Sequence, residues 1–242
     1  MNKKNICILC IKANKETFLF AETLYDEYNV YICIDDNECE LPIYDETKIN
    51  IIRFYDNESE EHYFKGSVVY AEDRACSRDK ALYYFCKINT NYEYVWFLEE
   101  DVFIPHKNTL SYIDNLYETE DLLTSEHIIK KSNDDNSPYW QHWWRNEKKI
   151  VFPWAHSMIC AVRVSNTLMN CILEFVNNNQ YLLFDELLFN TIALHNNLCV
   201  GTPIELSNIV FSFVDIIPDN INEHYLYHPI KNLKKQEELR IN

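Results

Sequence analysis

The chain has 242 residues, of which 47% are hydrophobic and 14% aromatic, and its formal net charge is −16 at pH 7. This composition is typical of a globular protein with a sizeable core and excludes an intrinsically disordered one. The acidic excess argues against a nucleic-acid backbone as the main partner, because phosphate backbones are bound by clustered Lys and Arg. A free nucleotide is still compatible with this charge, provided that a metal ion and a few local cations hold it.

The glycine and cysteine residues further limit which classes of protein are compatible with the sequence. Gly66 and Gly201 are the only glycines, which excludes a P-loop and a Gly-rich dinucleotide fingerprint. The odd count of nine cysteines favours reduced thiols. The apolar stretch at residues 6–11 is too short for a signal peptide or a membrane span, so we expect a cytoplasmic protein without an integral membrane segment. Seven cysteines lie in apolar segments and are expected to be small buried residues: Cys7, Cys10, Cys33, Cys86, Cys160, Cys171 and Cys199.

The first half of the chain alternates strand-like and helix-like segments. Residues 6–11 form a continuous apolar run, as in a strand that is covered on both faces. Helical spacing of apolar residues predicts helices over 15–28 and 71–88, and apolar runs predict strands at 30–34 and 49–54. This order predicts a parallel sheet with helices packed on its faces.

The second half is less regular. Residues 119–149 show no clear pattern, and the charged tail from Leu233 is expected to be peripheral. Further strands are predicted at 158–164 and 209–214, and further helices at 166–178 and 184–196. Since the chain shows no internal repeat and no linker, we predict one domain over residues 1–242.

An apolar run that begins at Tyr94 ends in three consecutive acids, Glu99, Glu100 and Asp101, and apolar residues resume at Val102. Burial of a carboxylate is costly, and adjacent like charges repel one another. A divalent metal would compensate these charges. The alternative is a solvated turn after a core strand.

The strand predicted at 30–34 also ends in acids, Asp35 and Asp36. Ligands bind where the strands of an open parallel sheet end, so these side chains could bind the ribose of a nucleotide whose diphosphate is held through the metal. A simple turn would also favour Asp at this position.

The order of elements and acids resembles the glycosyltransferases of the GT-A fold. Glu99-Glu100-Asp101 looks like the DxD-type motif of that family, with Glu in place of the first Asp. The resemblance implies a single α/β domain with a mostly parallel central sheet flanked by helices. It also implies a Rossmann-like, nucleotide-sugar-binding half at about 1–105 and an acceptor-binding half at about 106–242.

Two later segments extend the resemblance. Asp185 and Glu186 look like the acidic pair that opens a late helix and supplies the base in inverting members. Acids in a first helical turn also favour the helix dipole, which explains both residues without catalysis. His228 and Lys231 resemble the C-terminal element in which a His completes the metal site and a cation meets phosphate. A surface His before a Pro is the alternative.

Within this resemblance Asp101 is the expected metal ligand, and Glu99 assists it directly or through water. Imidazole suits Mn²⁺ better than Mg²⁺, so His228 makes Mn²⁺ the favoured cofactor. Cations expected on the diphosphate are Arg74, Arg78, Lys80 and Lys231, although such residues are often merely solvated. The aromatic block Trp140–Trp144, with Trp154 and His156, is either an acceptor platform or part of the core.

The sequence therefore predicts a metal-dependent glycosyltransferase that moves a sugar from a nucleotide-diphosphate sugar to an acceptor hydroxyl, for example of a glycan. One alternative is a catalytically silent relative that binds a glycan or a partner protein. A sugar-phosphate nucleotidyltransferase is a further alternative, but the Gly-rich phosphate loop expected of it is absent from the sequence.

Overall fold

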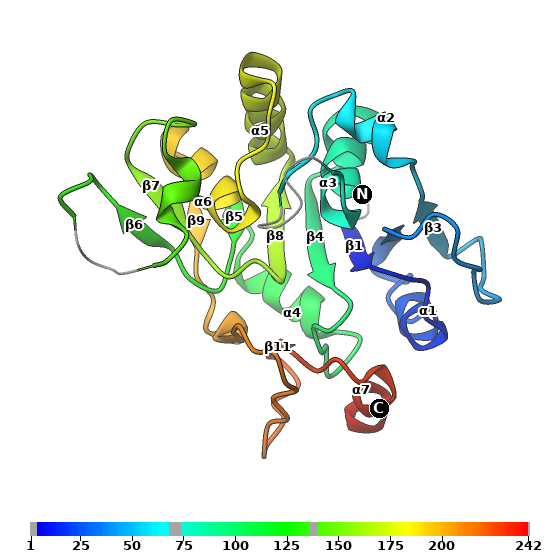
Figure 1. The fold of residues 1–242 in the computed structure, drawn as a ribbon. Coiled ribbons are helices and arrows are strands. Elements are labelled where there is room, and N and C mark those ends of the chain that lie inside the picture. Colours follow the sequence, from blue (N-terminus) through cyan, green and yellow to red (C-terminus); the bar gives the residue numbers. More distant parts are fainter. Residues whose placement is uncertain (1–3, 68–73, 136–139, 242) are drawn as a thin grey trace.

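The computed structural model describes residues 4–67, 74–135 and 140–241. Its centre is a seven-stranded sheet with the strand order β3-β2-β1-β4-β8-β5-β9 (Figure 1). Two short strand pairs, β6-β7 and β10-β11, lie outside this sheet. The strands are β1 Lys4–Cys10, β2 Tyr28–Ile34, β3 Ile49–Ile52, β4 Tyr94–Glu99, β5 Leu122–Leu123, β6 Ile128–Lys130, β7 Trp154–His156, β8 Ala161–Ser165, β9 Val200–Gly201, β10 Asn208–Ile209 and β11 Tyr227–His228.

The sheet is mostly parallel. β3, β2, β1 and β4 run parallel to one another, β8 is antiparallel to both of its neighbours, and β5 and β9 are again parallel. The predicted α/β class with a mostly parallel sheet and flanking helices is therefore confirmed.

Helices cover both faces of the sheet. The α-helices are α1 Lys15–Glu22, α2 Asp56–Glu60, α3 Ser77–Tyr83, α4 Thr109–Leu116, α5 Asn166–Asn179, α6 Asp185–His195 and α7 Leu233–Leu239. Alternation along β1 shows the layering, because Cys7 and Leu9 face the core under α3, α5 and α6. Ile6 and Ile8 face the opposite core, under α1 and α4. Each fully buried Leu, Ile or Phe in these cores contributes about 1.5–3 kcal/mol to stability.

The helix predicted over 71–88 begins later than expected. Residues 71–73 lie outside the described residues, residues 74–76 are not helical, and α3 begins at Ser77. The backbone N–H of Cys76 donates to the Asp79 carboxylate, which caps the start of the helix. A single π-helical turn, Tyr84–Ile88, then ends it.

The helix predicted over 15–28 ends early, at Glu22, and β2 begins at Tyr28. The hydroxyl of Thr23 donates to the Phe20 carbonyl at this end. β3 is also shorter than its predicted range, while α5 and α6 follow theirs closely. β8 begins at Ala161 rather than at residue 158.

The strand predicted at 209–214 is wrong beyond Ile209. β10 is only two residues long because β11, its partner, offers only Tyr227–His228 for pairing. The apolar residues that follow are exposed, and Phe213 is 84% exposed. Apolar character alone therefore did not identify a strand here.

The segment at 119–149 is irregular, as predicted, with the short strands β5 and β6 and a 3-10 turn at Trp143–Asn146. The sequence did not indicate α4 or β7. The tail is not peripheral, because α7 contacts α1 and buries Gln236. Charged residues on its outer face concealed this contact.

All nine cysteines are free thiols. Of the seven expected to be buried, Cys171 is half-buried because it lies within α5 beside the buried stripe of that helix, and Cys199 is exposed in the turn before β9. In the described part of the chain, no helix has the length and apolar character needed to cross a membrane.

Candidate functional site

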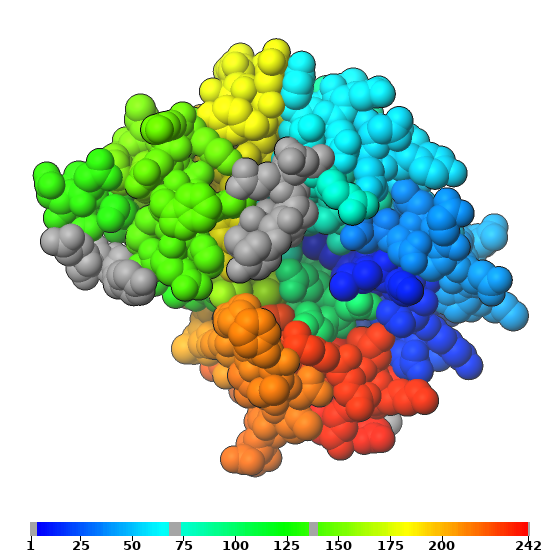
Figure 2. Space-filling view, viewed as in Figure 1, coloured from blue at the N-terminus to red at the C-terminus, as the bar shows by residue number. Residues whose placement is uncertain are grey.

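A cleft of about 600 Å³ lies at the carboxyl ends of β1, β2 and β4. β1 is central there, because the chain continues to β2 on one side while β4 pairs on the other. Such a switch in strand order is where open parallel sheets bind ligands. In Figure 2, green atoms lie recessed between the blue N-terminal and the orange and red C-terminal segments. Six of the predicted site residues line the cleft: Asp35, Arg78, Glu99, Asp101, Asp185 and Lys231.

Arg78 links two of the acids from the first turn of α3. Its Nη2 lies 2.5 Å from Glu99 Oε1, and its Nε lies 3.1 Å from Asp185 Oδ2. Nη1 also donates to the carbonyl of Ile159. The guanidinium is buried, so these contacts compensate its desolvation. Arg78 thus fixes carboxylates from β4 and α6 relative to each other.

His228, at the end of β11, faces the acidic turn after β4. Its Nδ1 lies 2.7 Å from the Val210 carbonyl, which can only accept, so Nδ1 carries a proton. Nε2 is left to face Asp101 Oδ1 at 3.3 Å and Glu99 Oε2 at 3.8 Å. A ring N–H bound to a carbonyl is the usual support for a metal-ligating His. Two carboxylates and one imidazole form a donor set that fits a divalent cation.

Asp101 is held by cations from the C-terminal segment. Lys231 Nζ lies 3.0 Å from Asp101 Oδ2, and the backbone N–H of Ile230 donates to the Asp101 carbonyl. Although burial opposes the effect, hydrogen bonds from His228 and Lys231 lower the pKa of Asp101. Burial likewise opposes a rise in the pKa of His228, yet its contact with Asp101 raises it. Asp101 is therefore ionised at neutral pH.

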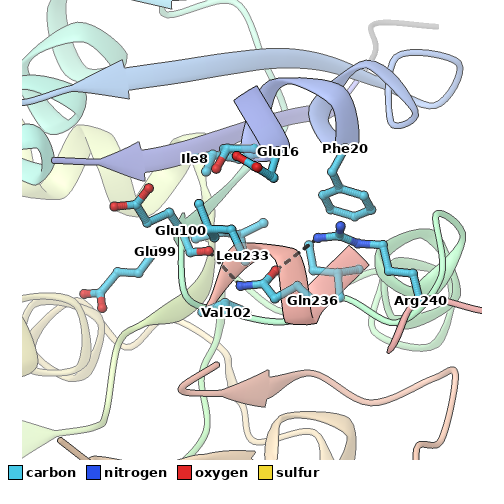
Figure 3. A pocket seen from close by; sticks show the side chains of 12 residues that line it. Ile8, Glu16, Phe20, Glu99, Glu100, Val102, Leu233, Gln236 and Arg240 are labelled. Carbon is cyan, nitrogen blue, oxygen red and sulfur yellow. Dashed lines mark hydrogen bonds between the residues drawn. The ribbon is translucent and has the colours of Figure 1, made fainter. Parts of the chain in front are cut away.

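Gln236 of α7 lies below the acidic turn after β4 and forms hydrogen bonds with it (Figure 3). Its Nε2 donates to the carbonyls of Glu100, at 3.0 Å, and Ile230, at 2.8 Å. Arg240 in turn donates to the Gln236 side-chain oxygen. These bonds join the end of β4 to the segment that carries His228 and Lys231.

The acids after β2 diverge. Asp35 lines the cleft, and its backbone carbonyl accepts from Lys80 Nζ at 2.9 Å. Asp36 is not among the lining residues, and Lys12 Nζ lies 3.8 Å from its carboxylate. The structure thus brings Asp35 to the cleft and leaves Asp36 beside it.

Two predicted cations lie away from the cleft. Lys80 is fully buried; its Nζ lies 2.8 Å from Asp56 Oδ1 and donates to the Asp35 carbonyl, so it links the start of α2 to the loop after β2. The Arg74 side chain is 78% exposed and lies 3.7 Å from Asp56. Neither residue lines the cleft.

Asp185 and Glu186 open α6; Asp185 lines the cleft, whereas Glu186 is next to it in the chain and is not among the lining residues. Asp185 is buried, and burial raises its pKa to about 7 even though Arg78 opposes the rise. Glu186 is half-buried, and burial followed by repulsion from Asp185 raises its pKa to about 8. In the described part of the chain, no hydrogen bond or ion pair is seen for the Glu186 carboxylate. The two carboxylates therefore differ in their contacts: Asp185 forms an ion pair with Arg78, and Glu186 forms none within the described residues.

The aromatic block packs mostly on itself. Trp140 stacks on His156 with ring centroids 4.3 Å apart and lies 6.1 Å from Phe184. Trp143 and Trp154 are buried in the same cluster. These contacts favour the core alternative. Trp144 differs, because it is 55% exposed.

Beside this cluster, His156 and Glu126 lie close together, and burial disfavours the charged form of each. His156 Nδ1 lies 3.7 Å from Glu126 Oε1. Burial lowers the pKa of His156 to about 4 and raises that of Glu126. An ion pair would shift both pKa values the other way.

Sequence reasoning missed two site residues. Cys160 lies directly before β8 and close to Glu99 and His228. Asn14, after β1, donates from Nδ2 to Glu100 Oε2 at 2.7 Å. An Asn between a strand and a helix was a visible signal for the second. Nothing marked Cys160, because its position depends on antiparallel pairing between distant segments.

Neither a scan of protein-family models nor a search of curated proteins finds a match to this sequence. Among solved structures, the fold is similar to that of 4-diphosphocytidyl-2C-methyl-D-erythritol synthase from Anaerococcus prevotii. The likeness covers 82% of this chain and 86% of that chain, with 8% sequence identity and a TM-score of 0.42. At that TM-score the likeness carries no argument about activity.

Proposed function

We propose that this protein is a metal-dependent glycosyltransferase that moves a sugar from a nucleotide-diphosphate sugar to an acceptor hydroxyl. One observation carries the proposal: Glu99, Asp101 and His228 converge at the carboxyl end of β4, where the strand order switches. An acidic pair at the start of α6 faces the same cleft through Asp185. Residues from both of the proposed halves, about 1–105 and 106–242, line this cleft.

On the donor side, Asp101 and His228 would hold the cation, with Glu99 assisting. A divalent ion there supplies charge stabilisation for the leaving diphosphate. Mn²⁺ is the proposed ion because an imidazole is part of the donor set. Lys231, next to Asp101, adds a positive charge on the same side, and Asp35 can accept hydrogen bonds from ribose hydroxyls.

On the acceptor side, Glu186 is the better base. Asp185 is committed to Arg78, whereas the Glu186 carboxylate makes no hydrogen bond within the described residues. Its pKa of about 8 lies near neutral pH, where a general base works best. In this scheme Glu186 takes the proton from the attacking hydroxyl, and Asp185 orients the turn through its contact with Arg78.

Product analysis tests this proposal. With Mn²⁺ and a panel of nucleotide sugars, glycosyl transfer or slow hydrolysis releases a nucleoside diphosphate. A nucleotidyltransferase would instead release pyrophosphate from a nucleoside triphosphate and a sugar phosphate. We expect nucleoside diphosphate from one donor, lost in Asp101→Asn and kept in Asp36→Asn. Pyrophosphate as the product would replace the proposal with the nucleotidyltransferase alternative, and the absence of both products would favour a silent binding protein.

A further inference from the structure

The antiparallel pairing of β4 and β8 places a thiol beside the acidic turn. Leu98 pairs with Ala161, and the Glu99 backbone N–H donates to the Cys160 carbonyl at 2.8 Å. Directly opposite residues of an antiparallel pair project from the same face, with Cβ atoms about 4.5–5.5 Å apart. The position of the Cys160 thiol next to the Glu99 carboxylate is therefore set by strand register.

His228 completes a compact set of donor atoms. One ligand atom each from Glu99, Cys160 and His228 lies within 4.8 Å of the others. Ligands of a tetrahedral zinc ion are roughly 3.5 Å apart, so small side-chain movements would close the set around an ion. His228 Nε2 already lies 3.8 Å from Glu99 Oε2. The ring is oriented by the Val210 carbonyl, as a structural His ligand requires.

We propose that Glu99, Cys160 and His228 form a site for a thiophilic divalent cation of the zinc class. Sulfur ligands favour Zn²⁺ and Co²⁺ over Mn²⁺ and Mg²⁺. Binding forms a metal–thiolate bond at Cys160 and releases the thiol proton to solvent. The Glu99 side chain is 35% exposed, which gives the cation a path into an otherwise buried set.

The inference rests on the proposed function in one respect, because Glu99 and His228 are shared with the proposed Mn²⁺ site. The two ions therefore exclude each other. Zn²⁺ is expected to inhibit Mn²⁺-dependent transfer, with Cys160 as the residue that gives Zn²⁺ its advantage.

Cobalt spectroscopy tests the site without any nucleotide. Co²⁺ is titrated into the full chain after chelator treatment, and the thiolate-to-cobalt charge-transfer band is recorded. Wild type and Cys199→Ser should both show the band, since Cys199 is exposed and lies outside the set. Cys160→Ser should lose the band and bind Co²⁺ at least about tenfold more weakly.

His228→Gln provides a second variant that leaves all thiols in place, and it should also weaken Co²⁺ binding and the band. An unchanged band in Cys160→Ser, or the absence of a band in wild type, would overturn the inference. The outcomes distinguish this inference from the proposed function. A cobalt–thiolate band without transfer activity would support the metal site and contradict the proposed function. Transfer activity without the band would support the proposed function and contradict the metal site.

Discussion

The end of β4 and the start of α6, which both reach the cleft, carry carboxylates whose pKa values are shifted in opposite directions. At the end of β4, Asp101 is contacted by His228 and Lys231, and these hydrogen bonds lower its pKa against the effect of burial. At the start of α6, burial raises the pKa of Glu186 to about 8. The difference follows from the neighbours and not from the residue type.

This contrast suggests a division of labour. A carboxylate that stays ionised is suited to holding a cation, whereas one that titrates near neutral pH is suited to moving a proton. Arg78 links the two regions, because it contacts Glu99 at the end of β4 and Asp185 at the start of α6. Substitutions on either side, and at this link, test whether the two sides are as different as their surroundings indicate.

The largest effect is expected at the link. Arg78→Met leaves the buried Asp185 carboxylate without its partner, and loss of one member of a buried pair costs about 3–5 kcal/mol. Urea unfolding at pH 7 measures the free energy of unfolding. Arg74→Met, at an exposed site, is the matched control and should change it by less than about 0.5 kcal/mol. Equal effects from both substitutions would contradict the assigned role of Arg78.

On the cation side, Asp101→Asn keeps the side-chain shape and removes the charge. We expect kcat/KM for the nucleotide-sugar reaction to fall by at least about 100-fold, because the cation loses its ionised ligand. Asp36→Asn alters an acid outside the cleft lining and should retain wild-type kinetics. If kcat/KM fell by less than about threefold in Asp101→Asn, the cation would not be bound by Asp101.

On the proton side, the pH dependence of stability tests Glu186. Its pKa is raised from about 4.3 in an unfolded chain to about 8 in the folded protein. The folded state thus binds more protons, and the free energy of unfolding falls as pH rises between these values. Partial exposure reduces the effect, so Glu186→Gln should be more stable than wild type by about 1–2 kcal/mol at pH 8.

The same two proteins should differ little near pH 4, where Glu186 is protonated in the folded state and mostly protonated in the unfolded state. Urea unfolding at several pH values between 4 and 8 gives both slopes. Parallel slopes for wild type and Glu186→Gln would show that the pKa of Glu186 is not raised.

An effect smaller than that of Arg78→Met is expected at Gln236, below the acidic turn. Gln236→Leu removes two hydrogen bonds to the carbonyls of Glu100 and Ile230 and should cost about 1–3 kcal/mol of stability. The substitution should also weaken metal binding, because Glu100 is next to Asp101 in the chain and Ile230 is next to Lys231, which contacts Asp101. Gln141→Leu, at an exposed position, serves as the control. Unchanged metal affinity in Gln236→Leu would limit α7 to a packing role.

Local patterns were enough to predict the parallel half of the fold. Apolar runs mark β1, β2 and β4, and acids after β2 and β4 indicated the edge at which the cleft lies. Long-range contacts could not be foreseen in this way. Cys160 reaches the site through antiparallel pairing of β8, and α7 docks through one buried glutamine. The apolar run around Phe213 was wrongly predicted as a strand, because it has no partner strand and is exposed.

Nucleotide-sugar binding, followed by thermal unfolding, tests the central claim most directly. A ligand that binds only the folded state raises Tm by mass action. We expect one nucleotide sugar of a panel to raise Tm only together with Mn²⁺, and Asp101→Asn to abolish that rise while Asp36→Asn keeps it. A panel that produces no rise with any divalent metal, or a full response in Asp101→Asn, would contradict the assignment of the acidic turn after β4 as the metal–diphosphate site.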